Sequence, residues 1–113
     1  MINPAHLRIE TMASGHLTLV LCQNADWSGF ESFARDFLAA HSGTVIDRAD
    51  SAVERVWTVA IGNAKLWLAF DDFQARFEIN AKDAAGDAAV RALAQTLGLQ
   101  NSGLQNLGLP DAR

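Results

Sequence analysis

Two side chains of this sequence could pair to make a nucleophile, the thiol of Cys22 and the imidazole of His6. A cysteine attacks as the thiolate, and a neighbouring imidazolium lowers the thiol pKa enough to populate that form. Such a reaction also needs an oxyanion site and a substrate cleft, and no sequence pattern supplies either. A small apolar cysteine packed in a strand, near a surface histidine, is the simpler interpretation.

The other polar residues that could do chemistry do not converge. Asp71 and Asp72 are adjacent, and two carboxylates are too few for a hard cation, so a solvated turn is expected there. His16 and His41 show no metal-ligand spacing. The Ser-Gly dipeptides lack the pattern of a nucleophile elbow, and there is no glycine-rich phosphate loop. We therefore expect no metal, no cofactor and no catalytic residue beyond the first pair.

The segment that must position Cys22 and His6 reads as a hairpin of residues 7–11 and 17–22. Its Ala-Ser-Gly loop ends in glycine, as three-residue hairpin loops with a final left-handed position do. This register pairs Ile9 with Leu19 on a core face and sets His6 opposite Cys22. The opposite face then carries His6, Arg8, Glu10, Thr18, Val20 and Cys22.

Three further runs alternate bulky and smaller residues, at 55–61, 65–70 and 75–79. This alternation is typical of antiparallel strands with one buried face. The dipeptide Gly62-Asn63 predicts a two-residue type II′ turn, because glycine takes positive φ at the first turn position. The turn sets Trp57 opposite Leu68, and both belong to the core face.

The second turn of this meander leaves two registers open. A loop that starts at Asp71 and has either two or four residues keeps the same side chains on the core face, because both counts are even. The two-residue loop is favoured, since it also sets Trp67 opposite Arg76 and Lys65 opposite Glu78.

The first of two predicted helices follows Ser28-Gly-Phe-Glu31, which matches a capping box, with Asp26 as a competing cap. Aromatic and aliphatic residues recur at helical spacing over 30–41, and Gly43 would end the helix as a left-handed cap.

A second helix is expected over about 84–97, capped by Asp83 or Asn80 and stopped by Gly98. The chain after it, from Leu99, is rich in glycine and amide residues. An irregular tail over 99–113 is the expectation there.

With a short strand at 44–48, the predicted order is β-β-α-β-β-β-β-α. It gives an α+β two-layer sandwich in one globular domain over 1–113, with a mostly antiparallel sheet of about six strands and two helices on one face. Nothing is left to cover the other face. That face would carry Val20, Val56, Thr58, Ala60, Trp67 and Ala69, with Arg76 and Glu78 beside them.

Composition narrows the functional classes. The chain has 113 residues, half of them hydrophobic, and a net charge of −4. Two lysines and seven scattered arginines do not form the basic surface that nucleic-acid binding requires. The N-terminus lacks a signal-peptide pattern, no apolar run reaches membrane-spanning length, and one cysteine fits a reducing compartment. We expect a cytoplasmic protein that binds neither nucleic acid nor membrane.

Two functions fit these features. The first is a protein-interaction module (a homodimer, adaptor or inhibitor) that acts through the sheet face around Trp67, since an exposed apolar patch rimmed by charge often marks a partner surface. Its binding residues would be Trp67, Val56, Thr58, Ala69, Arg76 and Glu78. The alternative is a small-ligand-binding protein or minor enzyme that uses Cys22 and His6. Pairing through a sheet edge is a further route to a partner, and a solvated sheet face with Trp67 stacked under Arg76 is the simplest interpretation of that surface.

Overall fold

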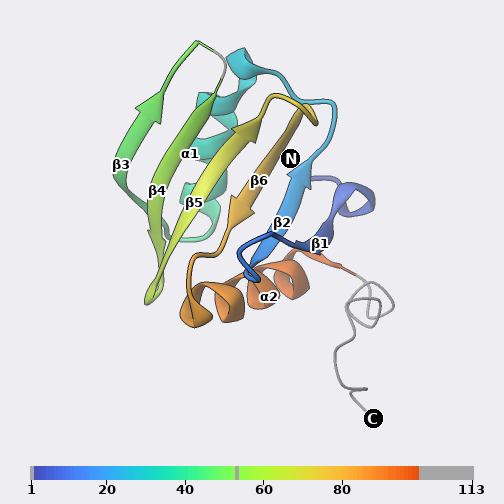
Figure 1. The fold of residues 1–113 in the computed structure, drawn as a ribbon, viewed down its shortest axis with the longest axis vertical. Helices are drawn as coiled ribbons and strands as arrows, with labels where there is room; N and C mark the ends of the chain where they lie inside the picture. Colours follow the sequence, from blue (N-terminus) through green and yellow to red (C-terminus); the bar gives the residue numbers. More distant parts are fainter. Residues whose placement is uncertain (1, 53, 100–113) are drawn as a thin grey trace.

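The computed structural model describes residues 2–52 and 54–99, where the elements follow the predicted order. In this part of the chain, six strands form one antiparallel sheet with the spatial order β1-β2-β6-β5-β4-β3 (Figure 1). The elements are β1 (Arg8–Thr11), β2 (Leu17–Cys22), α1 (Phe30–Ala40), β3 (Thr44–Asp50), β4 (Arg55–Ile61), β5 (Ala64–Asp71), β6 (Arg76–Asn80) and α2 (Ala84–Leu97).

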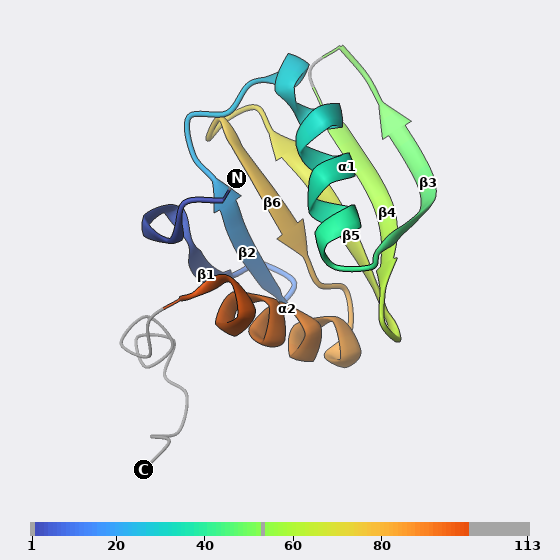
Figure 2. The ribbon, with the colours of Figure 1, turned by 180° about the vertical axis from the view of Figure 1, so that it is seen from behind.

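The helices occupy one side of the sheet, which we call the inner face. Figure 2 shows α1 in front of the strands and α2 running across their lower end. The opposite side, which we call the outer face, is the one seen in Figure 1, and neither helix crosses it there. The α+β two-layer fold predicted from the sequence is confirmed. Its core is a cluster of inner-face and helix residues that includes Trp57, Val59, Leu66, Leu68, Ile79, Phe30, Phe37, Val90 and Ala94.

Two hairpins have the predicted register. In the first, Ile9 pairs with Leu19. In the β4–β5 hairpin Trp57 pairs with Leu68, and Gly62 has φ +59°. A positive φ at the first turn residue alone is the geometry of a type II′ turn, which only glycine adopts without a Cβ clash.

The β5–β6 turn differs from both expected registers. Asp71 itself pairs with Arg76, so the loop consists of residues 72–75, and Trp67 lies opposite Asn80. The shift arises because the Asp71 carboxylate accepts a hydrogen bond from the Gln74 amide and Ala75 takes φ +49°. The observed pairing of β5 with β6 is displaced from each predicted register by an even number of residues, so the side chains of β6 keep their predicted faces.

A bulge in β2 overturns the predicted position of Cys22. Val20 pairs with Glu78, but Cys22 pairs with Phe77, and Leu21 is the extra residue. One inserted residue inverts the facing of everything after it. Cys22 therefore packs against the core cluster rather than lying on the outer face.

At the start of the first helix the competing cap, Asp26, is the one present, and the predicted end of the helix is corrected. The side chain of Asp26, not Ser28, accepts the hydrogen bond from the Gly29 amide, in a short 3-10 turn that precedes α1. At the other end Ser42 has the left-handed φ of +54°. Gly43 is needed for space instead, since a Cβ there would lie 2.6 Å from a methyl of Leu38.

The second helix begins and ends where the sequence predicts. Asp83 caps it by accepting from the Gly86 amide, and Gly98 ends it with φ +100°. The tail predicted over 99–113 lies, apart from Leu99, outside the described residues. Among the helices of the described part, none has the length and apolar character needed to cross a membrane.

Candidate functional site

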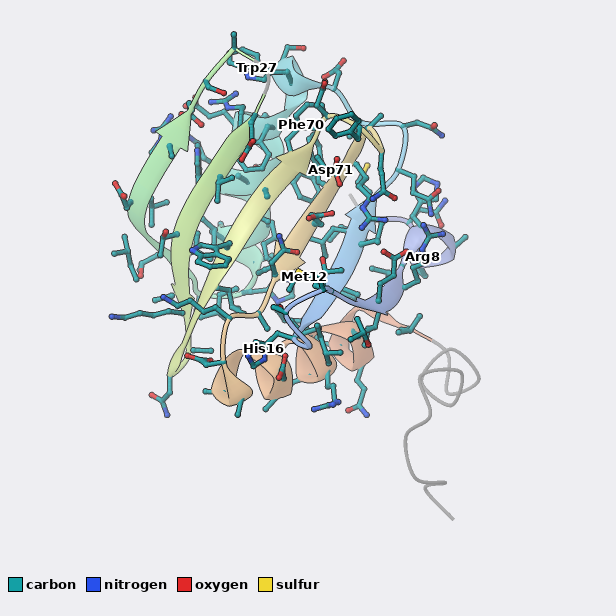
Figure 3. The ribbon with its side chains drawn as sticks, in the orientation of Figure 1. Arg8, Met12, His16, Trp27, Phe70 and Asp71 are labelled. Carbon is teal, nitrogen blue, oxygen red and sulfur yellow. The ribbon has the colours of Figure 1, made fainter. Side chains whose placement is uncertain are left out.

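The outer face is organised in rows of residues that run across the strands. One row consists of Thr18, Asn80, Trp67, Thr58 and Asp47, and the next of Arg8, Val20, Glu78, Ala69, Val56 and Ala49. Figure 3 shows this face toward the viewer, with Asp71 near its upper end and His16 near its lower end. The outward residues predicted on β4, β5 and β6 thus share one face, although the pairing between β5 and β6 is not the predicted one.

A hollow of about 380 Å³ opens on this face above the row of Trp67. Its floor is apolar and includes Val56 and Ala69. Phe73 stands at the rim in the β5–β6 turn and is fully exposed. Four carboxylates also line the hollow: Glu54, Asp71, Asp72 and Glu78. The hollow thus has an apolar floor and a negatively charged rim. It can hold an apolar side chain that has a positive charge near it.

The part of the outer face over β1, β2 and β6 is closed by its own side chains. Arg76, only 4% exposed, bridges Glu10 at 2.9 Å and Glu78 at 2.8 Å. This bridge crosses β2, and Val20 beneath it is fully buried. Arg76 is therefore a cover for the sheet rather than an exposed contact residue, and the open part of the face is the part formed by β4 and β5.

These ion pairs shift the pKa values of both partners. Hydrogen bonds from Arg76 lower the pKa of Glu10 below its ordinary value, against the opposing effect of burial. Burial acts to lower the pKa of Arg76, but hydrogen bonds to Glu10 and Glu78 outweigh it and raise that pKa. Both groups remain charged across the neutral range, so this part of the face is a fixed polar surface.

The lower end of the face is positive. The ammonium of Lys82 lies 5.7 Å from the ring centre of Trp67, so lysine takes the place expected for Arg76 over the indole. Lys65 pairs with Ala60 in the row below. Trp67 itself remains 39% exposed. An indole that has a lysine ammonium over its ring and is still partly open to water can act as an aromatic anchor.

The structure thus brings Val56, Ala69 and Glu78 together at the hollow and sets Trp67 and Thr58 in the adjoining row. Three further residues of this surface are not among the binding residues predicted from the sequence: Phe73, Lys65 and Lys82. For Phe73 the sequence does contain a signal of an exposed contact residue, namely a phenylalanine within a polar turn. The position of Lys82 depends on the register between β5 and β6, in which Asn80 and not Arg76 lies opposite Trp67.

The geometry at Cys22 is the opposite of that of an activated thiol. Burial raises the pKa of Cys22, and its thiol donates to the Gln23 carbonyl oxygen at 3.5 Å. His6 lies in a 3-10 turn, where its Nδ1 accepts a hydrogen bond from the Gln23 amide at 3.2 Å. The imidazole is therefore engaged with backbone, and the net effect of the surroundings raises the pKa of this thiol and disfavours the thiolate.

This arrangement predicts a slow thiol. We expect Cys22 to react with a thiol reagent more slowly than a free cysteine at neutral pH, because its raised pKa keeps the sulfur protonated. The measurement is the labelling rate of the native chain across pH, with the unfolded chain as control. An inflection at or below neutral pH would contradict it and favour the Cys22–His6 alternative.

The other histidines have structural partners. Nδ1 of His16 lies 2.8 Å from Asp87, whose other oxygen accepts from the Leu17 amide, so the first hairpin is tied to the first turn of α2. Burial against Phe37 lowers the pKa of His41. Within residues 2–52 and 54–99, no group of three or more His, Cys, Asp or Glu side chains could hold a metal ion.

A second hollow, of about 580 Å³, lies on the helix side of the molecule. Side chains of α1 such as Phe33 and Phe37 line it, together with Ile2 and Leu97. It is mostly apolar and shares no lining residue with the outer face. The two hollows are therefore independent features.

Comparison with known proteins gives one match. A family model described as "Protein of unknown function (DUF3630)" matches residues 7–98, a range that includes all the strands and both helices described above. No curated protein and no solved structure matches the chain.

Proposed function

Because the chain belongs to the DUF3630 family, whose description assigns no activity, we propose a function from the geometry: this protein is an interaction module that binds a protein through the outer face of its sheet. The observation that carries the proposal is the half-exposed indole of Trp67 beside an apolar hollow with an acidic rim. Aromatic anchors next to desolvated pockets contribute most of the energy in many protein interfaces.

The distribution of polar groups supports a surface that recognises rather than reacts. The acidic residues lie around the hollow and the lysines lie beside Trp67, so charge borders the apolar centre on two sides. Such a rim sets orientation and excludes wrong partners more than it adds affinity. Glu78 contributes to both features, since it lines the hollow and pairs with Arg76.

The compartment we propose is the cytoplasm. The single cysteine of the chain is half-buried and free, as cysteines in a reducing environment are. Cell fractionation tests this, with recovery of the chain in the cytosolic fraction as the expected result. Recovery with an exported or membrane fraction would contradict it.

The proposal predicts that Trp67 is the centre of the contact. A photo-reactive phenylalanine analogue in place of Trp67 should give one discrete cross-linked adduct in cells, whereas the same analogue in place of Arg91, exposed on α2, should not. After the adduct is identified by mass spectrometry, the purified partner is titrated against the wild-type and Trp67→Ala chains. We expect binding at least about 10-fold weaker for the variant, because the anchor is lost.

Two results would oppose the proposal. One is the absence of a discrete adduct from position 67. The other is equal affinity of the wild-type and Trp67→Ala chains for the identified partner, when both have the same unfolding midpoint.

A further inference from the structure

We propose that the occupant of the outer face is a second copy of this chain, packed face to face about a two-fold axis. This inference rests on the proposed function and specifies the partner of the same surface. In a two-fold dimer, a residue i of one copy that contacts residue j of the other also has the reverse contact, from j of the first copy to i of the second. The face must therefore be complementary to itself after a half turn. The outer residues of β5 have this property.

Along β5 the outward side chains are Lys65, Trp67, Ala69 and Asp71. In this order the four side chains are positively charged, large, small and negatively charged. Rotation by half a turn about Leu68, the middle of this stretch, sets Lys65 on the partner's Asp71 and Trp67 on the partner's Ala69. Opposite charges then meet at both ends, and a large side chain meets a small one twice. Side chains of packed sheets interdigitate in this way at about 10 Å between sheets.

The neighbouring strand β4 extends the apolar part of this contact. The hollow beside Ala69 also has Val56 as floor, so an incoming indole would meet apolar surface on two strands. Glu54 and Asp72 line the hollow at the same end of the face as Asp71, the residue that the partner's Lys65 would meet. Lys82 provides the second positive charge next to Trp67. Both lysines of the chain thus lie at one end of the face and three of its carboxylates at the other.

The whole outer face approaches the size of a standard dimer interface. Strands of up to eight residues span about 25 Å, and six strands spaced by about 4.8 Å give a width of about 24 Å. The projected area of about 600 Å² approaches the roughly 800 Å² of accessible surface that a standard interface buries on each partner. The buried network of Arg76 lies within this area, over β1, β2 and β6, and forms its polar part.

The exposed edge strand β3 is the rival site for self-association. All seven of its residues are exposed, and Ile46 is the most exposed apolar one. A bulge between Val45 and Asp47, with the charges of Asp47 and Arg48, interrupts the regular edge that strand addition needs. The β3 edge therefore has the features that proteins use to prevent strand pairing between molecules, whereas the outer face lacks them.

The test is sedimentation equilibrium of the full chain from micromolar to millimolar concentration, with two charge-reversed variants. Lys65→Glu/Lys82→Glu and Asp71→Lys/Asp72→Lys should each weaken dimerisation by at least about 100-fold, because like charges then meet at both ends. An equimolar mixture of the two variants should recover a heterodimer within about 10-fold of the wild-type affinity. Higher salt should weaken the wild-type dimer, since its end contacts are exposed ion pairs.

Two matched controls locate the contact. Arg91→Glu makes the same reversal on the outside of α2 and should leave the dimer unchanged. Ile46→Lys places a charge on the β3 edge and should also have no effect. Circular dichroism and unfolding midpoints show whether each variant is folded. The aspartate variant alters the β5–β6 turn, and if it does not fold, the lysine variant alone suffices for the test.

Each contrary outcome has a separate meaning. A wild-type chain that stays monomeric at millimolar concentration overturns the self-association, while a cross-linked adduct with a different protein at position 67 would leave the proposed function standing. A dimer that Ile46→Lys dissociates and the lysine reversals do not is an edge dimer, and it also overturns the inference. If no adduct forms at position 67 either, the proposed function fails with it.

Discussion

Replacing Arg76 with methionine should lower the free energy of unfolding by about 3 kcal/mol, because two carboxylates lose the only cation that bridges them across β2 in the described structure. Removal of one partner of a buried pair costs about 3–5 kcal/mol when the charge left behind stays buried. The side chain of Glu10 is 36% exposed and can turn toward water, which places the loss at the lower end. Glu78 is much less exposed and has no such escape.

Arg8→Met is the matched control. Arg8 also pairs with Glu10, at 2.6 Å, but its side chain is 52% exposed, and exposed pairs contribute about 0–1 kcal/mol. Urea denaturation followed by tryptophan fluorescence, at one fixed protein concentration, compares the two. Equal losses from Arg8→Met and Arg76→Met would show that burial of Arg76 does not decide the energy. Adding Glu10→Gln and Glu78→Gln to Arg76→Met should recover part of the loss.

The ion pair between Arg76 and Glu10 also predicts that stability depends on pH. Since the pKa of Glu10 is lower in the folded chain than its ordinary value of 4.5, the stability linked to it is fully present above that value. It is lost as the pH falls through the folded pKa. The unfolding midpoint of the wild-type chain should therefore fall more steeply with acid than that of Arg76→Met.

The assignment of side chains to the two faces could be made from the sequence because it depends only on parity. Trp67 and Glu78 lie on the outer face for any even loop in the second turn. The actual loop of residues 72–75 differs from both predicted loops, since it requires Ala75 at φ +49°, which a non-glycine residue rarely adopts. The hydrogen bond from the Gln74 amide to Asp71 is the local reason, and aspartate before a polar turn is its sequence signal.

The corrections that matter most for the site come from contacts distant in sequence. Arg76 and Glu10 are 66 residues apart, and they meet because β2 lies between β1 and β6. No local pattern specifies that order. The bulge that turns Cys22 inward has no glycine to mark it, so the predicted register with His6 continued one residue too far. In contrast, the sequence of charge and size along β5 lies within one strand and is readable without any tertiary contact.

The second large effect is expected at Asp50, at the end of the edge strand β3. One carboxylate oxygen of Asp50 accepts from the indole N–H of Trp57 at 3.0 Å and from Nε of Arg55 at 3.0 Å. The rings of Trp27 and Trp57 flank the arginines of this cluster, with Arg55 over Trp27 and Arg48 over Trp57. Hydrogen bonds from Arg55 and Trp57 lower the pKa of Asp50, with burial opposing them.

Asp50→Ala should therefore cost about 3 kcal/mol, since it leaves a fully buried indole N–H without an acceptor and a buried guanidinium without its closest anion. Asp50→Asn retains an acceptor of the same shape and should cost about 1 kcal/mol. Urea denaturation measures both changes. Glu31 remains as a second anion, 3.5 Å from Arg55, which limits the loss.

A double-mutant cycle with Trp57→Phe separates the two contributions. Phenylalanine removes the N–H, so in that background Asp50→Ala should cost less by about 1 kcal/mol, the share of the indole hydrogen bond. The remaining cost belongs to Arg55, whose guanidinium also donates to the Trp27 carbonyl at the start of the turn before α1. If the cycle shows no coupling, Asp50 acts on Arg55 alone. A neutral Asp50→Ala in the wild-type background would contradict the prediction, because the contact between the edge strand and the first helix would then not depend on this carboxylate.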